Sequence, residues 1–182
     1  MDATEKAVLC IVRSSRNNTL QGRTLLQKAI YFLNETMDLG IRYRPHYFGP
    51  FSEDVANTIA SLVAVGALRE MVECLPASSD PFDGCRYTYI LTELGRLMLE
   101  QEPDGDLESA CREILGETDD YSELAAAAKL HHIIKRHGGD FSYEAVMANA
   151  HDLGWKLQPR QIENAARLLV RLLRKGHLKA AS

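Results

Sequence analysis

Two β-prone runs in an otherwise helical chain constrain its fold more than any other feature. LREMVECL and CRYTYILT are both β-prone, and CRYTYILT is rich in β-branched and aromatic residues. The segment between them, PASSDPFDG, is rich in residues that form turns. The pattern predicts a β-hairpin over residues 68–92 with a long tip at 76–84.

Three segments ahead of the hairpin have helical periodicity. Residues 3–15 and 24–37 repeat apolar side chains on one face, and the wide stripe of the second segment predicts a mostly buried helix. Ser52 can cap a third helix, which Gly66 ends. The expected buried positions of the three helices are Ala7, Val8, Cys10, Ile11, Val12, Leu25, Leu26, Ala29, Ile30, Phe32, Leu33, Met37, Val55, Ile59, Leu62 and Val63.

The connection before the third helix contains Gly49 and Pro50 between aromatic residues. Residues 41–48, IRYRPHYF, alternate loosely and include a proline, which favours a short extended or edge segment. The glycine and proline then turn the chain sharply into the helix that follows.

Three helices followed by a hairpin within about 90 residues is the element order of a winged helix-turn-helix domain, in which the hairpin is the wing. An unrelated α+β fold with the same order is the alternative. A further helix is expected at 92–101, where Thr92 opens the segment TELGRLMLEQ.

We therefore predict a mainly α fold with a small β-hairpin wing, of the α+β class. Residues 1–101 form a winged-helix-like domain, residues 102–121 an acidic linker or helix, and residues 122–182 a C-terminal three-helix domain. The C-terminal helices echo the first set, since RLLRKGHLK has the helix end, glycine and apolar return of LVAVGALRE. This domain is either a second helix-turn-helix-like unit without a full wing or a plain three-helix bundle.

GRTLLQKAIYFLNE, followed by HYFGPFSEDVANTIASLVAVGALRE, resembles the Panacea antitoxin-like domain and the related YwgA-like proteins. The shared pattern is a lysine-bearing LQK helix, an aromatic-Gly-Pro-aromatic-Ser turn, and a helix that ends in a glycine before the wing. The resemblance covers about residues 3–100. It implies a winged-helix-like module of a family whose best-studied members neutralise a toxin partner by direct contact.

Charge is distributed very unevenly along a chain of net charge −4. Residues 100–123 carry ten acidic side chains against Arg112 alone, a net charge of −9. Residues 156–182 carry seven basic side chains against Glu163 alone, a net charge of +6. The asymmetry argues against a protein that coats nucleic acid over its whole surface and favours one local basic surface.

Composition and motifs limit the classes of function. The chain has no apolar run of about 18 residues and begins without the basic, then apolar, pattern of a signal peptide, so we expect a cytoplasmic protein with no membrane partner. Four scattered cysteines without CxxC spacing are expected to be free thiols, although Cys74 and Cys85 flank the hairpin tip and could face each other.

No catalytic residue or cofactor is predicted, because the sequence has no nucleophile elbow, Walker A loop or Rossmann glycine pattern. His131 and His132 point about 100° apart on one helix, so we interpret them as a half-buried pair and predict no metal site.

The turn and the third helix form the first candidate binding surface. The helix should expose Glu53, Asp54, Asn57, Thr58 and Ser61, without any lysine or arginine. Phosphate neutralisation provides most of the non-specific affinity for DNA, so this face suits a protein partner better. The predicted protein-binding residues are Tyr47, Phe48, Phe51, Asp54, Asn57 and Ser61.

The last helix forms the second candidate surface. Arg160, Asn164, Arg167, Arg171 and Arg174 share one face by their spacing, and Ile162, Ala166, Leu169 and Leu173 share an apolar face. Three interpretations remain open for this basic face: a solvated helix, a docking face for the acidic segment 100–123 of the same or another chain, and a nucleic-acid surface.

The sequence thus favours a non-catalytic regulatory binding protein, antitoxin-like or an adaptor, that recognises a protein partner. The alternative is a DNA-binding transcriptional regulator that uses the last helix, with a homodimer presenting two half-sites.

Overall fold

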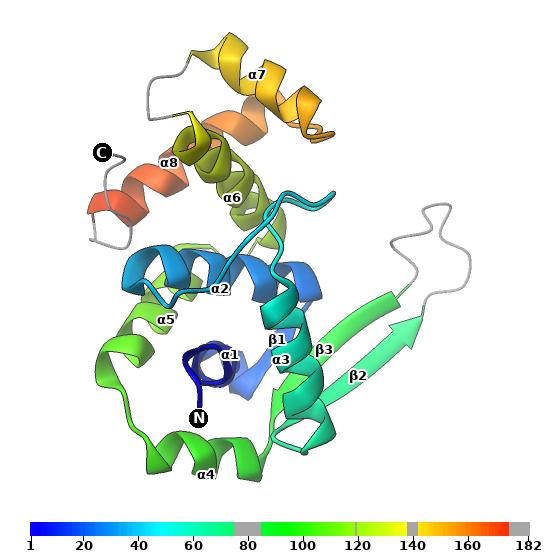
Figure 1. Ribbon diagram of the computed structural model, residues 1–182, viewed down its shortest axis with the longest axis vertical. Helices are drawn as coiled ribbons and strands as arrows, with labels where there is room; N and C mark the ends of the chain where they lie inside the picture. The colour runs from blue at the N-terminus through cyan, green and yellow to red at the C-terminus, as the bar shows by residue number, and fades with distance from the viewer. Residues whose placement is uncertain (75–84, 119, 138–141, 175–182) are drawn as a thin grey trace.

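The protein is mainly helical, with one small antiparallel sheet, in a computed structural model that describes residues 1–74, 85–118, 120–137 and 142–174 (Figure 1). Its α-helices are α1 (Ala3–Ser14), α2 (Arg23–Met37), α3 (Glu53–Ala64), α4 (Glu93–Gln101), α5 (Gly105–Glu117), α6 (Tyr121–Arg136), α7 (Tyr143–Asp152) and α8 (Pro159–Arg174), and a short 3₁₀ helix spans Arg16–Asn18. The strands are β1 (Thr19–Gln21), β2 (Leu68–Cys74) and β3 (Cys85–Leu91). None of the described helices has the length and apolarity needed to cross a membrane.

Helix α1 is the centre of the core. A capping box starts it, in which Asp2 accepts from the backbone of Glu5 and Glu5 accepts from the backbone of Asp2. Every residue from Ala7 to Val12 is buried, because α2, α3, α4 and α5 all pack around this helix (Figure 1). The burial predicted from periodicity is confirmed for five of these residues, and Leu9, which was not predicted, is buried as well.

The predicted hairpin is present as β2 and β3, which pair antiparallel with Leu68 opposite Leu91 and Cys74 opposite Cys85. Its tip lies outside the described residues. The sheet also contains a strand that the sequence did not predict, since β1 adds to the other edge of β3 and gives the order β1-β3-β2. A three-residue strand has too little periodicity to be recognised without its partner.

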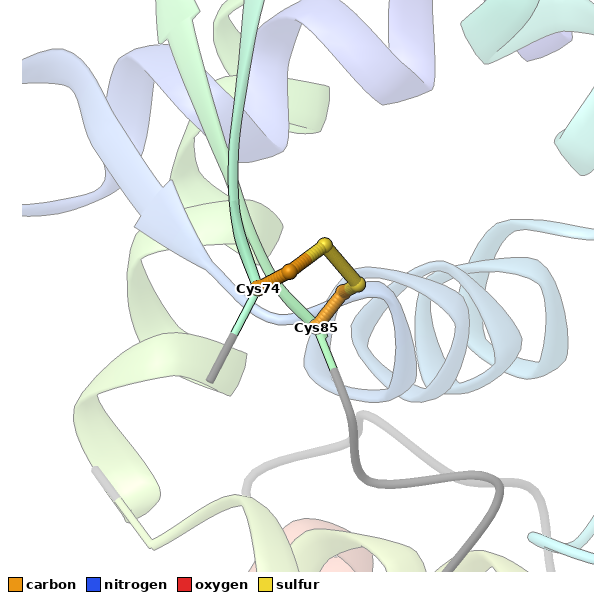
Figure 2. The surroundings of a disulfide bond; sticks show 2 residues. All are labelled: Cys74 and Cys85. Atoms are coloured by element: carbon orange, nitrogen blue, oxygen red, sulfur yellow. A yellow bond between two sulfur atoms is a disulfide. The ribbon is translucent and has the colours of Figure 1, made fainter. Parts of the chain in front are cut away.

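A disulfide joins Cys74 and Cys85 at the end of the hairpin (Figure 2). The expectation of free thiols was therefore wrong for this pair, because the strand register brings two cysteines directly opposite each other. Cys10 and Cys111 are free and buried.

The acidic segment contains a helix, α5, rather than an extended linker. Leu107, Ala110, Cys111 and Ile114 are buried where α5 packs against α1 and α2. The three expected C-terminal helices follow as α6, α7 and α8; α6 packs against α8, α7 and α2.

Candidate interaction surface around the Gly49–Pro50 turn

Residues 44–51 form a short hairpin-like turn with Tyr47 and Phe48 at its tip. Arg44 and Phe51 exchange two backbone hydrogen bonds of 2.9 Å, and His46 and Gly49 exchange a second pair of 3.2 and 2.9 Å. Gly49 has φ of 102°, a backbone conformation that favours glycine. The expected extended segment at 41–48 is thus reduced to the isolated bridge between Arg44 and Phe51.

Helix α2 holds this turn from behind through two buried polar side chains. Lys28 Nζ donates to the Pro50 carbonyl at 2.7 Å. The Gln27 amide donates to the Ser52 carbonyl at 3.0 Å and accepts from the Ser52 amide at 3.1 Å. Ser52 in turn caps α3 by accepting from Val55 N at 3.3 Å. The LQK segment therefore fixes both the turn and the start of α3.

Lys28 is an unusual buried lysine. Its side chain is 2% exposed, and burial, with a smaller contribution from Lys129, lowers its pKa from 10.5 to about 7. Burial also lowers the pKa of Lys129. The sequence contains one signal for the burial of Lys28, its position within the apolar run LLQKAIYF. This lysine was recognised only as part of the family motif.

The C-terminal helices hold the other side of the turn. Trp155 Nε1 donates to the His46 carbonyl at 2.6 Å, and a side chain at position 49 would meet Lys129 Cγ at 3.0 Å and Lys28 Cε at 3.2 Å. Gly49 is therefore required both by its backbone conformation and by the two lysines packed against it.

The histidine pair on α6 has structural contacts in the same region. His131 Nδ1 lies 2.8 Å from the hydroxyl of buried Tyr31, and burial lowers the pKa of His131 to about 4. The His132 ring packs against Trp155 with ring centroids 5.8 Å apart. The interpretation of both residues as a half-buried pair is confirmed.

Most of the predicted protein-binding residues lie on the surface. Tyr47 is 55% exposed and Phe48 39% exposed, and their rings pack edge to face with centroids 4.9 Å apart. Asp54, Asn57 and Ser61 are exposed on α3, whereas Thr58 is half-buried. Phe51 is also half-buried, with its ring centroid 5.1 Å from that of His46, so it supports the turn as well as bordering the surface. We name Tyr47, Phe48, Phe51, Asp54, Asn57 and Ser61 the turn surface.

Charges at the edge of the turn surface are largely paired. Arg44 forms an ion pair with Glu53, and Arg23 at the start of α2 forms one with Glu70 of β2 at 3.7 Å. Arg23 also stacks on Tyr87, 3.4 Å from the ring centroid.

The basic face of α8 divides into exposed and paired members. Arg160, Asn164, Arg167 and Arg174 are exposed. Arg171 forms ion pairs with Glu117 at 2.8 Å and Glu123 at 3.6 Å. Within one chain, Arg171 is thus the member of the described basic face that pairs with the acidic segment.

The apolar face of α8 was predicted partly wrongly. Ile162 and Leu169 are buried as expected, but Ala166 is exposed and Leu173 is 41% exposed. Ala165, Leu168 and Leu172 are buried in their place. The buried face of α8 is therefore rotated by about one residue toward the N-terminus from the predicted face. Packing against α6 sets this orientation.

No protein-family model matches the chain, and no curated protein matches its sequence.

Proposed function

We propose that the protein is a non-catalytic regulatory binding protein, antitoxin-like or an adaptor, that recognises a protein partner through the turn surface. The observation that carries the proposal is the pair Tyr47 and Phe48, exposed at the tip of a turn that is fixed from both sides. Aromatic side chains on a rigid support lose little conformational entropy on binding and are typical anchors of protein interfaces.

The order of elements supports a winged-helix assignment for the N-terminal part. Helix α1, strand β1, helices α2 and α3, and strands β2 and β3 follow one another, with β3 in the centre of the sheet. Under this proposal α3 would correspond to the recognition helix of a winged-helix domain and β2–β3 to its wing.

The chemistry of α3 favours a protein over a nucleic acid as partner. Its sequence, EDVANTIASLVA, contains no lysine or arginine and begins with Glu53 and Asp54, both exposed. An acidic helix start repels the phosphate backbone, while exposed Asn57 and Ser61 can donate and accept hydrogen bonds with a polypeptide.

Affinity capture with the full chain as bait tests the proposal. Three baits are compared in lysate of the source organism: the wild type, the Tyr47→Ala/Phe48→Ala variant, and Tyr143→Ala as an exposed aromatic control on α7. A partner recovered by the wild type and the control is then purified, and its Kd is measured by calorimetry. We expect the double variant to lose at least about tenfold in affinity, since interface aromatics contribute about 1.4 kcal/mol or more.

Equal affinity of the double variant and the wild type for that partner would contradict the assignment of the turn surface. Far-ultraviolet circular dichroism of each bait controls for folding. Because Tyr47 and Phe48 are exposed, the double variant is expected to remain folded.

A second candidate function, DNA binding, is favoured by the exposed basic side chains of α8 and by the turn that precedes this helix. Arg160, Asn164 and Arg167 are exposed along the N-terminal half of α8. The turn before it contains Gly154 with φ of 69°, as a tight connection between α7 and α8 requires. A helix-turn-helix unit presents the start of its second helix to the major groove in this way.

Fluorescence anisotropy with a labelled mixed-sequence duplex tests this candidate. DNA binding through α8 predicts that affinity falls steeply with salt, and that Arg160→Glu/Arg167→Glu removes it while Arg42→Glu does not. Arg171 is not a suitable position, because its reversal would also break the ion pairs with Glu117 and Glu123. Absence of salt-dependent binding by the wild type would exclude this candidate.

A further inference from the structure

The strand β2 lies at one edge of the sheet. In the sheet order β1-β3-β2, one side of β2 pairs with β3 and the other side has no partner strand within the described part of the chain. From Arg69 to Cys74 the strand is exposed apart from half-buried Glu70, and Met71 and Val72 are 44% and 48% exposed. A seven-residue edge with apolar side chains and no proline or lysine is a template for pairing with another strand.

The backbone of β3 determines which groups of β2 point outward. The Tyr87 carbonyl accepts from Gly22 on the β1 side, so the backbone groups of Tyr87 point away from β2. Val72 is opposite Tyr87, and this pair is therefore not hydrogen bonded. Because antiparallel pairs alternate, the N–H and C=O groups of Val72 and Glu70 point to the free edge.

We propose that β2 is a dimerisation edge, along which the β2 strand of a second copy of this chain pairs antiparallel around a twofold axis at Met71. Residues with outward-pointing backbone groups must then face each other, so Glu70 of each copy pairs with Val72 of the other. This register overlaps all residues from Leu68 to Cys74, whereas a twofold axis at Glu70 or Val72 overlaps fewer of them.

Charge complementarity identifies the occupant as a second copy. In this register Arg69 of one copy lies directly opposite Glu73 of the other, on the same face of the sheet as Met71. Both side chains are exposed, and no ion pair involves either of them among the described residues. The twofold axis repeats the pair, so two Arg–Glu contacts flank a central Met–Met contact.

The Cys74–Cys85 disulfide supports this role of the edge. It links β2 covalently to β3 at the end of the strand (Figure 2), and so keeps β2 in the sheet up to the last residue that the proposed pairing uses. The two sheets then join into one, in the order β1-β3-β2-β2-β3-β1. The inference is independent of the proposed function, which concerns the turn surface.

Sedimentation velocity of the full chain between about 1 and 200 µM tests the proposal, a range that detects micromolar association. We expect a reversible monomer–dimer equilibrium in the wild type. Arg69→Glu alone and Glu73→Arg alone place like charges opposite each other and should each weaken the dimer at least about tenfold. The double variant Arg69→Glu/Glu73→Arg restores both contacts and should dimerise within about threefold of the wild type.

Mixing the two single variants provides a second, independent readout. One chain then presents two acidic side chains and the other two basic ones, so a heterodimer should form where neither variant self-associates. Arg42→Glu, exposed outside the sheet, is the matched control and should leave the dimer unchanged. A wild type that is monomeric throughout the range, or a dimer that is insensitive to the single charge reversals, overturns the proposal.

Val72→Pro tests the backbone contribution. It removes an N–H that points to the free edge rather than to β3, so the hairpin keeps its ladder while the pairing edge loses a donor. Monomeric Val72→Pro with a wild-type circular dichroism spectrum supports the proposal, and an undiminished dimer contradicts it.

Discussion

Trp155 donates its indole N–H to the backbone carbonyl of His46 at 2.6 Å, joining two segments that are 109 residues apart in the sequence. Trp155 lies in the turn between α7 and α8, and His46 lies in the turn that presents Tyr47 and Phe48. The buried Trp155 side chain therefore connects the turn at 44–51 to the segment that leads into α8.

Trp155→Phe should reduce the free energy of unfolding by about 1–2 kcal/mol, because it leaves the His46 carbonyl without its donor. Trp155 is the only tryptophan, so unfolding by denaturant is best followed by circular dichroism rather than fluorescence. The control Tyr143→Phe changes an exposed ring and should have little effect. Equal stability of Trp155→Phe and the wild type would show that the hydrogen bond contributes nothing to holding the turn.

Lys28 should make the protein more stable as the pH rises from about 7 to 10. The folded pKa of about 7 is below the unfolded value of 10.5, so the unfolded chain binds more protons between these limits. Below pH 7 the lysine is charged in both states and its cost is fully present. Within the window the free energy of unfolding should increase by about 1.4 kcal/mol per pH unit from this group.

Lys28→Met removes this contribution, and denaturant unfolding at several pH values measures it as the difference in slope from the wild type. Lys156→Met, at an exposed position, is the control and should keep the wild-type slope. If Lys28→Met and the wild type have parallel profiles, the pKa of Lys28 is not lowered.

Gly95→Ala should destabilise the protein by more than 2 kcal/mol. A Cβ at this position of α4 would collide with the Ala67 carbonyl and lie 2.8 Å from Leu91 Cδ1, so the helix would have to move away from the sheet. Gly116→Ala in α5 is the matched control. Its Cβ meets nothing within 4 Å, and alanine should stabilise the helix by up to about 1 kcal/mol. In thermal unfolding, the Tm of Gly95→Ala should be lower than that of the wild type and the Tm of Gly116→Ala higher.

The Cys74–Cys85 disulfide should be measurable by thiol titration in denaturant. Unreduced protein should release two reactive thiols, from Cys10 and Cys111, and reduced protein four. Replacing both hairpin cysteines by serine should cost about 2–3 kcal/mol, as expected for a bond that closes a short loop. Four thiols without reduction would contradict the bond.

Local patterns in the sequence were sufficient to predict most helices and the hairpin. The apolar stripe of α1, the Ser52 cap of α3 and the turn residues between β2 and β3 act within a few residues of the elements they define. Exposure of Asp54, Asn57 and Ser61 follows from the same periodicity. Gly49 and Pro50 were also sufficient to indicate a turn beside Tyr47 and Phe48.

Contacts between distant segments decided the remaining features. Strand β1 exists because it pairs with β3, and the disulfide because the register places Cys74 opposite Cys85. The orientation of α8 and the ion pairs of Arg171 depend on α5 and α6.

The sequence by itself determined where the chain is helical, where it turns, and that α3 has no basic side chain. Only the tertiary structure decided that Lys28 is buried against Pro50 and that Trp155 supports the turn from the other side. The physical reason is the range of the interactions: periodicity and capping act between neighbours in sequence, whereas burial and its effect on the pKa of Lys28 depend on helices folded over it.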